Sequence, residues 1–121
     1  MTDRDFLIWL AGFIDGDGCL SISHARSWRA TKYLPIITVT QANRTILDEC
    51  QRRTGLGTVT GPYYYKTWVS WHWSVRGRQA LLLAQWLPLI VKRPQAEIFR
   101  NYDANKGAAH EAIRGLSNAK V

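Results

Sequence analysis

Two glycines four residues apart interrupt the first helical stretch of the chain, within the segment Leu10 to Gly18 (LAGFIDGDG). Residues at this spacing lie one turn apart on the same helix face. Because each glycine costs a helix about 1 kcal/mol relative to alanine, Gly12 and Gly16 call for a packing reason. The simplest is the close approach of a second backbone, as in helix pairs with small residues at this spacing.

Two carboxylates stand where this helix is expected to end. The last carbonyl groups of a helix have no intrahelical donor, and the helix dipole makes this end partly negative. Asp15 and Asp17 are therefore unfavourable there unless a positive group offsets them, and a hard divalent cation binds both carboxylate and carbonyl oxygens. Residues two apart on a helix point in different directions, so we expect only Asp17, at the exit, to meet the metal. Gly18 is then expected to provide the left-handed turn that releases the chain.

Simpler interpretations exist for each part of this segment. The tetrapeptide Asp-Gly-Asp-Gly is by itself typical of a turn, and paired glycines also occur in close packing within one domain. An EF-hand loop starting at Asp15 fails, because Cys19, Leu20 and Arg26 stand where a ligand, a glycine and a glutamate are needed. The nine residues together are much more specific than any part.

The complete segment resembles the signature of the LAGLIDADG homing endonucleases, with Phe13 in place of a leucine and Gly16 in place of an alanine. In that family two such helices pack across a twofold axis, and each ends in an acidic metal ligand. The resemblance implies that Asp17 is catalytic and binds Mg²⁺, or Mn²⁺ or Ca²⁺ in its place, with the Gly16 carbonyl also facing the metal. The predicted dimer interface comprises Leu10, Gly12, Phe13, Asp15 and Gly16.

Two more positions match the family by their place in the chain. A polar residue, often glutamine, ends the second strand beside the metal in that family, which implies a catalytic role for Gln41. The family also has a basic residue at the position of Lys92, where a lysine near the scissile phosphate can offset developing charge. Arg93 is an alternative, because both side chains can reach phosphates. Without the resemblance, Gln41 is a polar residue entering a turn and the basic pair is a solvated loop.

The hydrophobic pattern predicts an α+β fold with the order αββαββα. The expected strands cover residues 19–24, 32–41, 58–60 and 68–75. The expected helices cover residues 3–15, 43–54 with Asn43 as the cap, the stretch from Gly77 to 86, 94–102 and 108–116. Hairpins imply a curved antiparallel sheet covered by helices on one face, which is also the core fold of the family. Residues 1–105 are expected to form the endonuclease domain and residues 106–121 a helical or frayed extension.

The uncovered face of such a sheet can lie in the DNA major groove, which admits a β-ribbon. Its candidate residues are polar or small, and a basic turn around Trp28 adjoins them. Ordinary solvated positions of an alternating strand are the simpler interpretation. The residues predicted to contact DNA are Ser21, Ser23, Arg26, Trp28, Arg29, Lys32, Thr38, Thr60, Ser70, His72 and Arg93.

Charge and cysteine usage point to an intracellular nucleic-acid-binding protein. The chain has 16 basic and 9 acidic residues and a net charge of +7, the electrostatic footprint of such proteins, although basic proteins also bind membranes and acidic partners. Cys19 and Cys50 match no zinc spacing. No apolar run approaches the ~20 residues of a membrane span, and the N-terminus lacks the pattern of a secretory signal. The compartment (cytoplasm, organelle or phage-encoded) stays open.

Each chain has one motif and is therefore expected to recognise one half of a DNA target. A twofold homodimer on double-stranded DNA is predicted. Its target would be approximately palindromic and on the order of 20 bp long. The resemblance implies a magnesium-dependent, sequence-specific endonuclease that cuts both strands and leaves 3′ overhangs. The alternative is a non-cleaving module on the same fold, either a DNA-binding regulator or an intron maturase with an RNA partner. A basic structural protein without sequence preference would instead show binding governed by salt alone.

Overall fold

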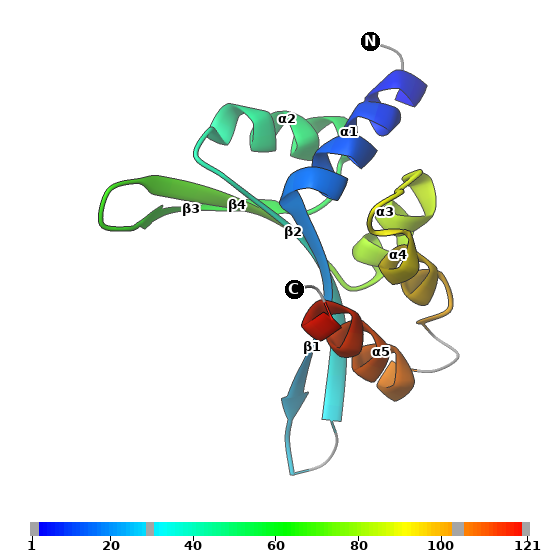
Figure 1. Cartoon of the computed structure of the whole chain (residues 1–121). Helices are drawn as coiled ribbons and strands as arrows, with labels where there is room; N and C mark the ends of the chain where they lie inside the picture. Colours follow the sequence, from blue (N-terminus) through cyan, green and yellow to red (C-terminus); the bar gives the residue numbers. More distant parts are fainter. Residues whose placement is uncertain (1–2, 29–30, 103–105, 120–121) are drawn as a thin grey trace.

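The computed structural model describes residues 3–28, 31–102 and 106–119. A four-stranded antiparallel sheet lies at its centre, with helices packed on one side (Figure 1). The predicted α+β architecture with a C-terminal helix is confirmed. The elements in chain order are α1 (Asp3–Asp17), β1 (Gly18–Arg26), β2 (Thr31–Gln41), α2 (Arg44–Thr54), β3 (Thr58–Tyr64), β4 (Val69–Arg76), α3 (Arg78–Trp86), α4 (Arg93–Arg100) and α5 (Lys106–Ala119).

The sheet is built from two hairpins that share only their inner ends. Its strand order is β1-β2-β4-β3, and β2 pairs with β4 only from Ile36–Arg76 to Gln41–Trp71. The outer parts of the hairpins therefore diverge as two arms, β3–β4 to the left and β1–β2 downward in Figure 1. The sheet is curved because each arm follows its own twist beyond the shared region.

One face of the sheet carries the hydrophobic core. Alternate strand residues point to this face, and α1 covers it with Phe6, Leu10, Ala11 and Ile14, all buried. Helix α5 packs on β1 and contributes buried Ala109 and Ile113 to the same core. The buried strand residues are Leu20, Ile22, Ile37, Val39, Trp73 and Val75.

Helix α1 and strand β1 follow each other without a turn, contrary to the prediction. The helix continues to Asp17, and Gly18 opens the strand without a positive φ. Gly18 is needed for another reason: a Cβ atom there would lie 2.9 Å from both the carbonyl oxygen and Cγ2 of Ile14. The chain can therefore pass directly from helix to strand only where no side chain is present.

Strand β3 is longer than predicted. The sequence predicts a strand over residues 58–60 only. In the structure Gly61 and Pro62 insert an irregularity between Thr60 and Tyr63, after which pairing with β4 resumes to Tyr64. A bulge adds a residue to one strand without ending the ladder. The other boundaries differ from the predicted ones by a few residues, and the division of the chain at residue 105 stays a prediction.

The two cysteines occupy different environments. Cys19 is exposed on β1, whereas Cys50 is buried in α2, and burial raises the pKa of its thiol to about 12. Cys50 is therefore a protonated core residue at neutral pH. Among the described helices, none has the length and apolar character needed to cross a membrane.

Asn43 provides a direct test of the local signals that define α2. Its side chain accepts a hydrogen bond from the Thr45 backbone nitrogen at 2.9 Å. We expect Asn43→Ala to lower the free energy of unfolding by about 1 kcal/mol, and Asn43→Gly to lower it by only about a few tenths. Urea denaturation of both variants measures this, and equal losses would contradict a capping role.

Candidate active site and nucleic-acid interface

The end of α1 and the end of β2 meet at one corner of the sheet. Because Gly18 pairs with Val39, the residue before Gly18 lies beside the last residues of β2. Gln41 Nε2 donates a hydrogen bond to Asp17 Oδ2 at 2.8 Å, although the two residues are 24 positions apart. Asp17 is exposed. Gln41 thus orients a solvent-facing carboxylate at the helix terminus.

Asp15 faces the loop between α3 and α4. Its carboxylate accepts hydrogen bonds from the backbone nitrogens of Ile90 at 2.8 Å and Lys92 at 3.0 Å. In return, Lys92 Nζ donates to the backbone oxygen of Asp15 at 2.6 Å. That oxygen is one of the terminal carbonyls of α1 that lack a helical donor, so the ammonium group offsets the negative end of the helix.

These contacts distinguish the two basic candidates. Lys92 is only 7% exposed and lies at the end of α1. Arg93 is exposed at the start of α4, and its Nε donates to the carbonyl of Leu89 in the preceding loop at 3.4 Å. The structure brings Lys92, and not Arg93, into contact with the helix that carries Asp17.

The groups at this corner suit a hard cation. Carboxylate oxygens of Asp17 and the terminal carbonyls of α1, Gly16 among them, are the donors that Mg²⁺ or Ca²⁺ accepts. No three His, Cys, Asp or Glu side chains gather anywhere in the described part of the chain. At this corner the exposed carboxylate among the described residues is that of Asp17. A full coordination sphere therefore needs water, phosphate oxygens or a second copy.

The outward face of α1 carries two exposed glycines, Gly12 and Gly16, and so has no side chains at these positions. A Cβ atom added at Gly12 or Gly16 would meet nothing within 4 Å. Ile8, one turn before Gly12, is 52% exposed, and the neighbouring Trp9 is 40% exposed and stacked on Phe13 at 5.1 Å. Ile8 and Trp9, which are not among the predicted interface residues, therefore form an exposed apolar surface beside the glycines together with the predicted Phe13.

Leu10 does not belong to this face, and its predicted place in the interface is wrong. It is 0% exposed within the core of its own chain. Residues two apart on a helix differ by about 200° in direction, so Leu10 points away from Gly12.

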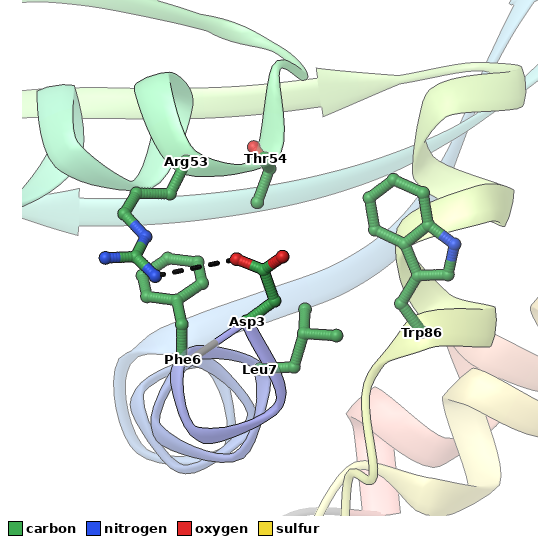
Figure 2. Close-up of a pocket in the computed structure, with 6 residues that line it drawn as sticks. All are labelled: Asp3, Phe6, Leu7, Arg53, Thr54 and Trp86. Atoms are coloured by element: carbon green, nitrogen blue, oxygen red, sulfur yellow. Dashed lines mark ion pairs between the residues drawn. The ribbon is translucent and has the colours of Figure 1, made fainter. Parts of the chain in front are cut away.

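The other side of α1 faces α2 and α3 (Figure 2). The Arg53 guanidinium lies 4.7 Å from the centre of the Phe6 ring and 3.8 Å from the Asp3 carboxylate. Trp86 faces them from α3 across a hollow that Leu7 and Thr54 also line. Because Asp3 is fully exposed, its ion pair contributes little, and α1 is fixed mainly by its apolar side.

Most of the predicted DNA-contacting residues lie on the uncovered face of the sheet. Strand alternation from the paired residues assigns to this face Ser21, Ser23, Lys32, Thr38, Thr60 and His72. Two predicted residues do not lie on this face. Arg26 falls on the covered face by its alternation with the buried Leu20 and Ile22, and Arg93 lies in α4, on the side of the sheet that the helices cover. Trp28 is 86% exposed beside the β1–β2 hairpin, and Arg29 lies outside the described residues.

Ser70 requires a correction, because it is 0% exposed and its side chain cannot reach DNA in this structure. The irregularity at Gly61–Pro62 places Tyr63 opposite Ser70, and the Tyr63 ring stacks on His72 at 4.3 Å. Tyr63 was missed because β3 was expected to end at Thr60. The available signal was the aromatic run that follows, Tyr-Tyr-Tyr-Lys-Thr-Trp.

Comparison with known proteins identifies the family. A family model described as LAGLIDADG endonuclease matches residues 10–83, more than half of the chain. The chain belongs to the LAGLIDADG endonuclease family. No curated protein sequence matches this LAGLIDADG endonuclease chain.

Several solved homing endonucleases share its fold. I-CvuI, in complex with its target in the presence of calcium, has a TM-score of 0.76 and 25% identity, over 98% of this chain and 85% of that one. The archaeal intron-encoded I-Vdi141I, complexed with DNA, has a TM-score of 0.70 and 21% identity over 98% and 72% of the two chains. I-TnaI has a TM-score of 0.68 and 21% identity over 90% and 76%. The LAGLIDADG fold thus extends over nearly the whole chain.

The hydrogen bonds of Asp15 can be tested by substitution. Asp15→Ala leaves the buried Lys92 without the acceptor for its backbone N–H, so we expect a loss of about 1–3 kcal/mol in the free energy of unfolding. Asp48→Ala removes only an exposed ion pair with Arg44 and should cost less than about 0.5 kcal/mol. Chemical denaturation measures both variants, and equal losses would contradict the anchoring role of Asp15.

Proposed function

We propose that two copies of this chain form a metal-dependent homodimer that recognises a long, approximately palindromic DNA site and cuts both strands, leaving 3′ overhangs. The main support is the arrangement of α1. One helix carries both a bare glycine face and, at its end, the outward carboxylate of Asp17. A second copy packed on that face brings two such carboxylates together.

The surface of α1 supports a twofold contact. Ile8, Gly12 and Gly16 follow one another at four-residue intervals, so they form one stripe along the helix. In a twofold interface the same patch meets itself, and glycine lets the two backbones approach closely. Ile90 and Val91, 72% and 60% exposed in the loop held by Asp15, extend the apolar surface beside the end of α1.

Chain lengths agree with a two-chain assembly. This chain covers 85% of I-CvuI but only 37% of I-GzeII, a LAGLIDADG homing endonuclease in complex with its DNA target. One copy thus accounts for less than half of the longer protein. Two copies of a single-motif chain would supply a comparable amount of structure.

The chemistry follows from what the chain places at the helix ends. Two Asp17 carboxylates near a common axis repel each other unless cations lie between them. I-CvuI has been crystallised with its own target in calcium, and with the uncleaved I-CreI target in magnesium. A divalent ion bound there supplies polarisation of the phosphate and lowers the pKa of a bound water. Gln41 holds the carboxylate in position, and the Lys92 ammonium provides positive charge beside the developing charge on phosphate.

Cleavage is the first test of this proposal. Asp17→Asn preserves the size of the side chain and a hydrogen bond to Gln41 but removes the charge, so we expect cleavage of a randomised-site DNA library in Mg²⁺ to fall by about 100-fold or more. DNA binding should persist, and Asp48→Asn, an exposed control on α2, should cut like the wild type. If the wild type, like Asp17→Asn, binds a discrete site but does not cut it, the chain is a non-cleaving DNA-binding module.

The dimer is tested separately. Gly12→Leu should yield a folded monomer in analytical ultracentrifugation, because a Cβ atom at this exposed position meets no atom of its own chain within 4 Å, whereas a leucine side chain would block the approach of a second helix. Gly115→Leu is the matched control, since Gly115 is also an exposed glycine in a helix, α5, with nothing within 4 Å. A Gly12→Leu protein that dimerises on DNA as tightly as the wild type would exclude this interface.

A further inference from the structure

The side chains on the uncovered face of the β3–β4 hairpin change from polar to aromatic toward its tip. Near the shared region Thr60 pairs with His72. Beyond the irregularity, Tyr63 occupies the same face, with its ring on His72 at 4.3 Å and its hydroxyl donating to Thr60 Oγ1 at 2.9 Å. Thr60 and His72 are thus in contact with the Tyr63 side chain, and Ser70, which pairs with Tyr63, is buried.

The last row of the hairpin is entirely aromatic. The Tyr65 nitrogen donates to the Trp68 carbonyl at 2.9 Å, which continues the alternation one row beyond the Tyr64–Val69 pair. Tyr65 and Trp68 therefore fall on the same face as Tyr63. Their rings stack at 4.4 Å with an interplanar angle of 12°, and they are 50% and 52% exposed.

The position of this pair indicates what it meets. The outer end of the β3–β4 arm projects beyond α2 (Figure 1), and the uncovered face of the arm is continuous with the face proposed to lie on DNA. Lys66 stands in the turn between Tyr65 and Trp68, and the chain carries a net charge of +7, so a polyanion is favoured at the tip. The apolar group that duplex DNA offers in the major groove is the C5-methyl of thymine.

This inference rests on the proposed function: we propose that Tyr65 and Trp68 form an apolar reading surface that contacts thymine methyl groups in each half-site. The hairpin tip then selects T·A pairs by excluding water from a methyl group. The other hairpin differs, because its outer face carries Ser21, Ser23 and Lys32, which can form hydrogen bonds. The two arms would read the half-site by different chemistry.

Uracil substitution in the DNA tests the inference. A binding site is first selected from a randomised duplex library with the wild-type protein, and each thymine is then replaced singly by deoxyuridine, which lacks the methyl group. We expect the Kd to rise about fourfold at each contacted position, the effect of one methyl-sized group. The effect should vanish in the Tyr65→Ser/Trp68→Ser variant.

Tyr64→Ser is the matched control. Tyr64 is 80% exposed at the same tip but alternates to the opposite face, so this variant should keep the uracil profile of the wild type. The uracil-substituted duplexes are also measured with the wild-type protein alone. The test therefore remains valid if the double variant fails to fold.

The outcomes separate this inference from the proposed function. A wild type that selects a site but binds every uracil-substituted duplex equally well overturns the inference and leaves the proposed function intact. The inference also fails if the folded double variant keeps the wild-type profile, or if it loses affinity for all sequences alike, which would indicate sugar or phosphate contacts. A wild type that selects no site contradicts the proposed function itself.

Discussion

The negative end of α1 is the constraint on which the rest of the site depends. A helix C-terminus already carries unsatisfied carbonyls and partial negative charge, and here it also carries two carboxylates. The protein offsets Asp15 internally, with two backbone N–H groups and the Lys92 ammonium on the adjacent carbonyl. Among the residues that the structure describes, the hydrogen-bond donor to the Asp17 carboxylate is the uncharged Gln41 amide. The uncompensated charge thus faces outward, where a cation can bind.

The same helix also determines how two such charges would be spaced. Gly16 directly precedes Asp17, so in the proposed dimer a backbone contact at the glycine face would fix the separation of the two carboxylates more tightly than contacts through long side chains. Glycine weakens the helix locally. The opposite side of α1, fully buried at Leu10 and Ile14, supplies the tertiary packing that keeps the helix formed. Packing of the core and the proposed contact with a second copy therefore use two different faces of α1.

Caps, glycines and strand alternation made much of the fold predictable from the sequence. The features that were not predicted depend on contacts between residues far apart in the chain. The Asn43 cap and the left-handed Gly55 define α2 from neighbouring residues alone. The predicted strand over residues 19–24 alternates, with Leu20 and Ile22 on one side, and both are buried in the structure. The Asp15–Lys92 contacts join residues 77 positions apart, and no periodicity reports such a contact. The face of Tyr63 depends on the register after an irregular pair, which only the partner strand sets. Leu10 was misplaced because the signature was treated as one surface, although helical geometry separates it from Gly12.

The aromatic character of the β3–β4 arm has a structural cause as well as a proposed role. A two-stranded hairpin that projects from its domain is only marginally stable in water, and cross-strand aromatic pairs are among the contacts that stabilise it. The Tyr63–His72 and Tyr65–Trp68 stacks therefore order the arm before any DNA is present. An ordered reading surface loses less conformational entropy on binding than a flexible one. The rings that hold the hairpin together are thus suited to be the ones that contact bases, because the entropy of ordering them is already lost in the free protein.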